Sequence, residues 1–308
     1  HPRTLHVNFP FSLVLANCRV RGQNPRMGVG GFHTQVIRRA RGIRAVLGAP
    51  PYVSPGHYYS PVTAPEDRAT AVGWRDLPPV GVDLREADQL RLAAELAPYL
   101  RELPTDRWHD HNGMYGRADA AVLHAMLRHL RPARLIEVGS GYSTAVALDV
   151  VARYLPELQI TCVEPYPQRL RSRLRPGDRV ELIQRRVQDV DRDTFAALGP
   201  GDILLIDSTH VVKAGSDVVW LLLHVLPTLR PGVVVHVHDI HWPFEYPEKW
   251  LREGRDWTEV YLLRAFLTGN TAWQVLLFTS WLWSQRPDAV PAELRGLPTG
   301  AFWMRRTG

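Results

Sequence analysis

The chain has 308 residues, of which 45% are hydrophobic and 22% are charged, and it carries a formal net charge of +6. These proportions are ordinary for a soluble globular protein, and no apolar run reaches the roughly 20 residues that cross a bilayer, so a membrane-spanning chain is excluded. The basic excess is almost entirely arginine, because Lys213 and Lys249 are the only lysines. The arginines are scattered along the chain, whereas a nucleic-acid binder usually gathers them on one face, so we expect no nucleic-acid partner. Two cysteines, Cys18 and Cys162, give no disulfide framework, which favours the reducing cytoplasm.

The first part of the chain differs in pattern from the rest. Residues 1–37 show no apolar periodicity, and we interpret them as an extension, or a remnant of processing or cloning, with little structure. Residues 48–82 are rich in proline and glycine, which predicts an irregular arm. Helical periodicity begins at Leu84, with leucines on one face. We therefore expect residues 38–117 to form an arm and helices that cover the active site.

Residues 118–308 are expected to form the main domain, because helical and strand-like patterns alternate there. Strand-like runs occur at Arg134–Val138, Gln159–Glu164, Arg179–Ile183, Asp202–Asp207 and Gly232–His238. Helical patterns occur at about 118–131, 143–154, 167–174, 191–197, 215–229 and 255–267. Strands that are almost continuously apolar suit a parallel sheet with helices on both faces. The prediction is a Rossmann-like, doubly wound α/β fold with a mostly parallel sheet, which Ala272–Ser280 and Ala301–Arg305 close as an antiparallel pair.

The strongest local signal is a glycine-rich turn between the first strand and the following helix. Gly139 and Gly141 let the backbone approach a ligand closely, and the helix that starts near Ser143 offers free N–H groups. Glu164 ends the next strand, about 20 residues further on, where an acidic residue can accept hydrogen bonds from ribose hydroxyls. After the third strand, Gln188 and Asp189 are candidates to bind an adenine edge; the alternative for Asp189 is a helix N-cap.

These motifs resemble the class I S-adenosylmethionine-dependent methyltransferases, and most closely the branch called methyltransferase family 24. The run Glu137–Gly141 looks like their first motif, and Glu164 looks like their ribose-binding acid. Two further runs, Asp207–Lys213 and His238–Pro247, look like hallmarks of this branch, which includes bacterial proteins and relatives of antibiotic-sugar O-methyltransferases. The resemblance implies that Tyr115, Gly116 and Asp119 wall the cofactor site. The expected cofactor-binding set is Tyr115, Glu137, Gly139, Ser140, Gly141, Ser143, Thr144, Glu164, Pro165, Gln188, Asp189 and Asp207.

Two carboxylates and several histidines follow the fourth and fifth strands. Asp207 ends the fourth strand and His238 and Asp239 end the fifth, while His210 and His241 follow about one turn later. Because the carboxyl ends of parallel strands line one crevice, these side chains are expected to converge near the sulfonium. We predict that His210 or His238 is the base and that Asp207 acts with it.

A divalent metal such as Mg²⁺ or Mn²⁺ is a further expectation. Enzymes similar to catechol O-methyltransferase carry metal-binding acids at these strand ends, and Asp207 matches one such position. Asp207, His238 and Asp239 are the predicted ligands, although a histidine departs from the oxygen ligands that Mg²⁺ favours. The alternative for any single histidine here is a purely structural role, with no part in catalysis or metal binding.

The expected function is methyl transfer to a hydroxyl of a small, sugar-like or natural-product metabolite. One alternative is a non-haem iron oxygenase that uses His236, His238 and Asp239 as a two-histidine, one-carboxylate site. A second is a non-catalytic module that binds S-adenosylmethionine, and a third is nucleic-acid methylation, supported only by the arginine excess. Trp257, Glu259, Tyr261 and Arg264 are candidates for substrate contacts. The partner expected is a small-molecule substrate, and a homo-oligomer stays open.

Overall fold

The computed structural model describes residues 52–110 and 112–308. The chain divides into two compact units, His1–Ser54 and Pro55–Gly308. Every helix and strand among the described residues belongs to the second unit. The interpretation of residues 1–37 lies outside the described residues.

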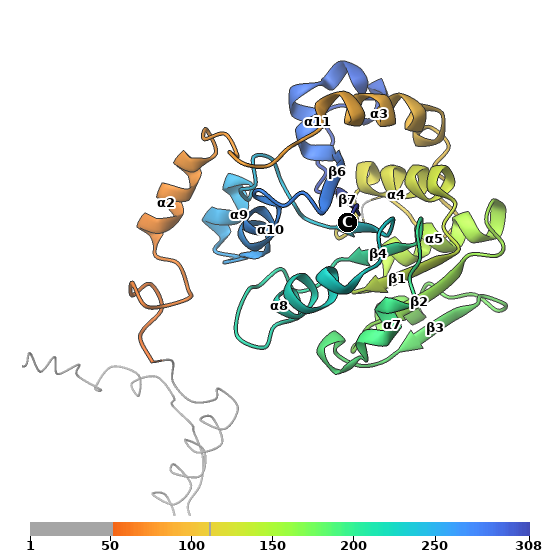
Figure 1. The fold of residues 1–308 in the computed structure, drawn as a ribbon, viewed down its shortest axis with the longest axis horizontal. Helices are drawn as coiled ribbons and strands as arrows, with labels where there is room; N and C mark the ends of the chain where they lie inside the picture. Colours follow the sequence, from red (N-terminus) through yellow and green to blue (C-terminus); the bar gives the residue numbers. More distant parts are fainter. Residues whose placement is uncertain (1–51, 111) are drawn as a thin grey trace, which may run out of the picture. The chain divides into compact units, whose positions relative to one another are not determined.

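A seven-stranded sheet forms the centre of the second unit (Figure 1). Its strands are β1 (Arg134–Val138), β2 (Gln159–Val163), β3 (Val180–Ile183), β4 (Ile203–Ile206), β5 (Val234–Val237), β6 (Trp273–Phe278) and β7 (Phe302–Arg306). They lie in the order β3-β2-β1-β4-β5-β7-β6. The first five pair in parallel, and β7 is antiparallel to both β5 and β6. The predicted Rossmann-like sheet with an antiparallel closing pair is confirmed.

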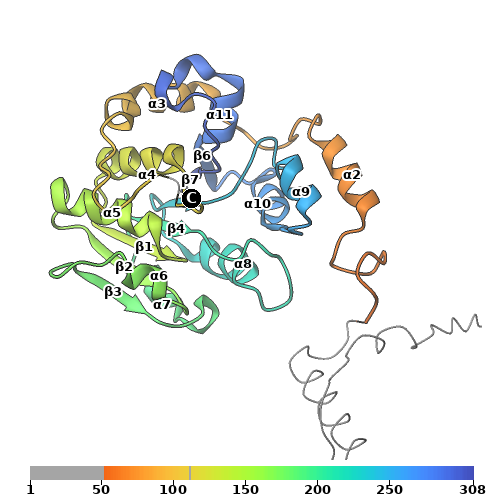
Figure 2. The ribbon, with the colours of Figure 1, turned by 180° about the vertical axis from the view of Figure 1, so that it is seen from behind.

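The burial of the strands explains why their sequences are almost continuously apolar. Every residue of β4 and β5 is buried, because helices cover both faces of the parallel sheet. Around the parallel strands lie α4 (Arg117–Leu130), α5 (Tyr142–Arg153), α6 (Gln168–Arg171), α7 (Arg192–Ala196) and α8 (Asp217–Trp220). α4 packs on α5, and α3 (Glu86–Leu100) packs on α4 and β6, whereas α8 belongs to the crossover between β4 and β5 (Figures 1 and 2). In an open α/β sheet of this kind, ligands bind at the carboxyl ends of the parallel strands.

The helix predicted at 215–229 is interrupted. After α8 the chain forms a π-helical turn at Leu221–Val225 and a 3₁₀ turn at Leu226–Thr228. Pro227 has no N–H to donate, so a regular helix cannot continue through it.

Three helices lie where the sequence pattern predicted none. The arm predicted to be irregular contains α2 (Pro65–Trp74), which has proline at its first turn and two acidic residues beside its N-terminus, both favourable starts. The run His238–Pro247 is followed by α9 (Glu248–Glu253), which ends at Gly254 in a left-handed conformation. The strand predicted to reach Ser280 ends at Phe278, where α11 (Thr279–Gln285) begins.

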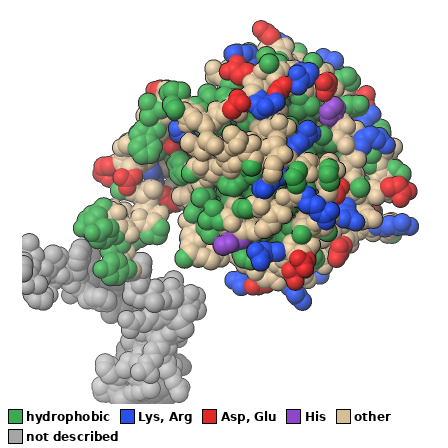
Figure 3. Space-filling view, in the orientation of Figure 1, with side chains coloured by type: hydrophobic (Ala, Val, Ile, Leu, Met, Phe, Trp, Pro, Cys, Tyr) green, Lys and Arg blue, Asp and Glu red, His purple; other side chains and the backbone are tan. Residues whose placement is uncertain are grey.

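The described surface carries mixed charge. On the face in Figure 3, basic and acidic side chains are interspersed rather than gathered into one continuous basic stripe. Among residues 52–110 and 112–308, each helix is too short or too polar to cross a membrane.

Candidate active site

A cavity of about 620 Å³ lies at the carboxyl ends of the parallel strands. It is lined by most of the residues predicted from sequence: Tyr115, Gly139, Ser140, Gly141, Ser143, Glu164, Pro165, Gln188, Asp207, His210 and Asp239. Three predicted cofactor residues, Glu137, Thr144 and Asp189, lie outside its lining. The strand ends therefore bring the two halves of the predicted site, the glycine turn and the carboxylates, to one hollow.

Gly139 lets the turn after β1 lie directly against the end of β4. Its φ is +82°, a left-handed conformation that side chains disfavour. A Cβ added there would lie 1.8 Å from the carbonyl oxygen of Asp207. The Gly139 N–H donates to the carbonyl of Val163 at 3.1 Å, and the Asp207 N–H donates to that of Val138 at 2.9 Å. A larger residue would push the turn away from the end of β4.

Glu137 supports the turn from beneath. The carboxylate is fully buried and accepts a hydrogen bond from the Thr144 hydroxyl, which in turn accepts from the Gly141 N–H at 3.0 Å. Burial raises the pKa of Glu137 to about 7, against the hydrogen bonds from Ser143 and Thr144 that lower it. Glu137 and Thr144 thus hold the shape of the turn and are not positioned to touch a ligand.

Glu164 follows β2 and lines the cavity beside the glycine turn. Its carboxylate accepts hydrogen bonds from the Ser140 N–H at 3.1 Å and from the Tyr166 N–H at 2.7 Å. These contacts fix the carboxylate at the edge of the hollow, where ribose hydroxyls would approach it. Gln188 also lines the hollow, whereas Asp189 is paired with Arg186 at 2.9 Å and points elsewhere.

Asp207, His210 and Asp239 form a compact polar group at the cavity. Each offers one ligand atom, and these atoms lie within 4.8 Å of one another. His210 Nε2 is 3.5 Å from an oxygen of Asp207 and 3.5 Å from an oxygen of Asp239. His210 and Asp239 both adopt positive φ, +61° and +57°, a conformation that costs energy in a residue other than glycine. Strained backbone at two facing side chains is typical of a functional centre.

His210 is held tightly in this group. Its Nδ1 is 2.8 Å from the buried carboxylate of Glu259, and its ring packs on Trp257 with centroids 4.5 Å apart. Burial lowers the pKa of His210, but the hydrogen bonds with Asp207 and Glu259 outweigh burial and raise it well above 6.5. The surrounding carboxylates therefore stabilise the charged imidazolium.

His238, which the sequence offered as a base and a metal ligand, lies behind the cavity. It is buried and stacks on the Tyr115 ring with centroids 4.8 Å apart. Its Nε2 is 3.7 Å from Asp239, but its side chain does not line the hollow. His236 packs against Trp303, with centroids 4.5 Å apart, and does not line the hollow either. The group at the cavity holds one histidine and two carboxylates, in contrast to the two histidines and one carboxylate of the iron-oxygenase alternative.

Asp119 supports Asp239 indirectly and does not wall the cavity. Its carboxylate accepts hydrogen bonds from the Thr299 hydroxyl at 2.7 Å and from the Gly300 N–H at 3.1 Å. Gly300 lies so close to Asp239 that an added Cβ would be 2.9 Å from its Cα. Gly300 thus lies close against the backbone of Asp239, and Asp119 fixes Gly300 through these hydrogen bonds.

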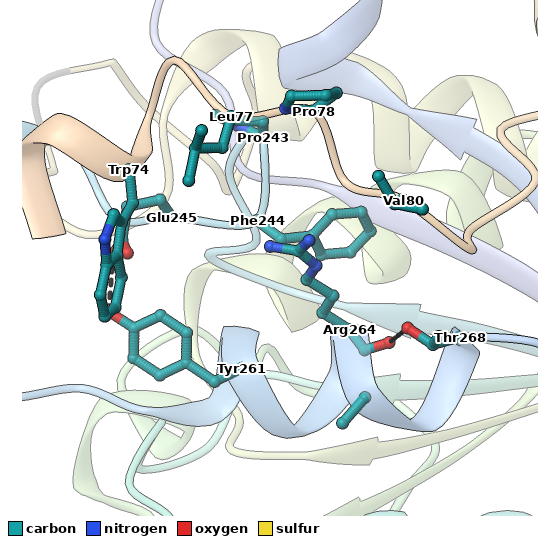
Figure 4. Close-up of a pocket in the computed structure, with 11 residues that line it drawn as sticks. Trp74, Leu77, Pro78, Val80, Pro243, Phe244, Glu245, Tyr261, Arg264 and Thr268 are labelled. Carbon is teal, nitrogen blue, oxygen red and sulfur yellow. Dashed lines mark hydrogen bonds between the residues drawn. The ribbon is translucent and has the colours of Figure 1, made fainter.

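Several lining residues were missed by sequence reasoning, among them Met114, Tyr142, Tyr166, Arg169 and Lys213. Most flank residues that a motif did identify, and adjacency to those motifs is the only sequence signal they carry. Of the four candidates for substrate contacts, only Trp257 lines this cavity. Tyr261 and Arg264 line a second cavity of about 560 Å³ between the arm and α10 (Glu259–Leu267), shown in Figure 4.

The sheet order, the glycine turn after β1 and the acid after β2 together define the class I methyltransferase architecture. Residues 136–240 match the sequence model of methyltransferase family 24, described as a methyltransferase domain. An uncharacterized protein of Archaeoglobus fulgidus is 34% identical over 161 residues, which cover 47% of this chain and 72% of that protein. The chain belongs to this family of S-adenosylmethionine-dependent methyltransferases.

Solved structures of similar fold include methyltransferases at low sequence identity. The Podospora anserina methyltransferase PaMTH1, bound to S-adenosylhomocysteine, is 17% identical, with a TM-score of 0.44 over 79% of this chain and 95% of that chain. A cmcI structure with Mg and S-adenosylmethionine is 21% identical, with a TM-score of 0.35 over 61% of this chain and 70% of that chain.

Proposed function

We propose that this methyltransferase acts on a hydroxyl of a small, sugar-like or natural-product metabolite, with assistance from a divalent metal. The observation that carries the proposal is the convergence of Asp207, His210 and Asp239 on the hollow that also holds the glycine turn and Glu164. A hydroxyl needs alignment and loss of its proton to attack a methyl group, and this group supplies polar contacts for both.

S-adenosylmethionine would bind at the carboxyl ends of the parallel strands. Glu164 is assigned to the ribose hydroxyls, and the backbone of Ser140 and Gly141 to the close approach of the cofactor. Gln188 is assigned to the adenine edge. Asp207, Asp239 and Trp257 line the rest of the hollow, where the methyl group and the acceptor would meet.

The polar group fits a divalent cation. Two carboxylates and one imidazole are a common donor set for a divalent cation. Ligand atoms that are each about 2.1 Å from a cation lie about 3 to 4 Å from one another. The three ligand atoms of this group lie within 4.8 Å of one another, close to that separation. Asp207, His210 and Asp239 would hold the ion, so the set differs from the predicted one by His210 in place of His238. A bound cation would lower the pKa of the acceptor hydroxyl.

The protein's own residues then have separate roles. Asp207 and Asp239 flank the acceptor, and one of them accepts the hydrogen bond of the hydroxyl and orients it toward the methyl group. When no ion is bound, Nε2 of His210 takes up the proton, and when Nε2 holds the ion, the proton passes to solvent. Because neighbouring carboxylates raise the pKa of His210, activity without a cation should increase toward alkaline pH.

The test is incubation of the purified protein with methyl-labelled S-adenosylmethionine and extracts of the parent organism. Parallel reactions contain Mn²⁺, Mg²⁺ or a chelator. We expect a labelled product that base treatment does not release, as for a methyl ether, and less of it with chelator. Absence of cofactor binding by calorimetry, together with absence of labelled product, would refute the proposal. A product labelled on nitrogen or carbon would refute the hydroxyl assignment alone.

A further inference from the structure

We infer that Glu259 is a positioning residue, which fixes the ring of His210 so that Nε2 faces Asp207 and Asp239. The inference rests on the proposed role of this group as the polar centre of methyl transfer. Sequence reasoning offered Glu259 as a substrate contact, but its side chain is fully buried and does not line the cavity.

The carboxylate of Glu259 selects one form of the imidazole. One of its oxygens lies 2.8 Å from His210 Nδ1, and a carboxylate only accepts, so Nδ1 must carry the hydrogen. Nε2, 3.5 Å from each of Asp207 and Asp239, is then the nitrogen turned to the reaction side. A buried carboxylate that orients a histidine in this way is the usual support of a metal-binding or basic imidazole.

The backbone around Glu259 clamps the same histidine. The N–H groups of Thr258 and Glu259, at the start of α10, donate to the carbonyl of His210 at 2.9 and 3.0 Å. The Thr258 hydroxyl accepts from the Val212 N–H at 2.7 Å. These bonds hold His210 in its positive-φ conformation, and Trp257 covers its ring. The side chain of Glu259 and the backbone at the start of α10 therefore both contact His210.

The other oxygen of Glu259 does not tie the side chain to a second described residue. It is buried and has no hydrogen-bond partner among the described residues. The one bond that the side chain makes goes to the ring of His210.

The test compares Glu259→Gln with Glu245→Gln in the full-length protein. Glu245 is a suitable control, because it is also buried and its partners are not members of the polar group. It accepts hydrogen bonds from the Tyr261 hydroxyl, shown in Figure 4, and from the Tyr246 N–H, both at 2.7 Å. Three quantities are measured: the ¹⁵N shifts of the His210 ring, the affinity for Mn²⁺ and the affinity for S-adenosylhomocysteine.

We expect Glu259→Gln to change the ¹⁵N shifts of His210 and to weaken Mn²⁺ binding about 10- to 100-fold. Its affinity for S-adenosylhomocysteine should stay within about threefold, and Glu245→Gln should leave all three quantities unchanged. Unchanged His210 shifts in Glu259→Gln would overturn the inference, as would equal losses of Mn²⁺ affinity in both variants. If the wild-type protein binds no Mn²⁺, the proposed metal assistance fails, and the His210 shifts still decide the role of Glu259.

Discussion

Replacement of Gly139 by alanine should damage both the stability of the protein and its cofactor site. The left-handed φ of +82° costs an alanine about 1 to 2 kcal/mol. The added Cβ would also lie 1.8 Å from the backbone oxygen of Asp207, which no rotamer change can relieve. Such overpacking costs about 3 kcal/mol, so we expect a total loss of about 4 to 5 kcal/mol in the free energy of unfolding.

Gly177→Ala is the matched control. Gly177 has a φ of +92°, and a Cβ added there meets nothing within 4 Å, so this variant isolates the conformational cost. Urea unfolding gives the two free energies, and calorimetry gives the affinity for S-adenosylmethionine. We expect Gly177→Ala to lose about 1 to 2 kcal/mol and to bind normally, and Gly139→Ala to bind at least about tenfold more weakly. Equal stability and equal affinity in the two variants would refute the close approach of β1 and β4 at the site.

Three other changes test separate parts of the site. Glu164→Gln should weaken S-adenosylmethionine binding about tenfold in a calorimetric titration, because a charge-assisted hydrogen bond to ribose is worth about 1.5 to 3 kcal/mol. The control is Glu181→Gln, at an exposed position, which should have no effect in the same titration. Asp239→Asn should lower kcat at least about 100-fold and leave cofactor affinity within about threefold; a kcat within threefold of wild type would remove Asp239 from the chemistry. Burial raises the pKa of Glu137 from 4.5 to about 7, so the folded state binds more protons than the unfolded state between these values, and stability falls as the pH rises through this window. Glu137→Gln lacks this effect, and its stability relative to wild type should rise by about 3 kcal/mol between pH 4.5 and pH 8; a difference that is constant with pH would contradict the buried, neutral carboxyl.

The parallel sheet could be predicted because its signals are local. The runs Ile203–Ile206 and Val234–Val237 are apolar at every position except His236, and they are buried on both faces as that pattern requires. The glycine turn was also visible, since Gly139 and Gly141 follow a strand and precede a helix. The proline-rich composition of the arm does not predict α2, because proline usually breaks helices, whereas Pro65 stands at the first helical turn, where it is favourable.

The arrangement of the histidines could not be predicted, because it depends on contacts between distant segments. His238 is adjacent to Asp239 in sequence, but its ring is turned to Tyr115 on the loop before α4. His210 joins the polar group instead, through Glu259, which lies 49 residues further along the chain. No periodicity or spacing in one sequence indicates that pairing.

The most direct test of the account is a crystal structure of the protein with S-adenosylhomocysteine and Mn²⁺. We expect ribose hydroxyls on Glu164, the sulfur beside Asp207, and the metal held by Asp207, His210 and Asp239. A cofactor bound elsewhere, or a metal held by His238 in place of His210, would contradict it.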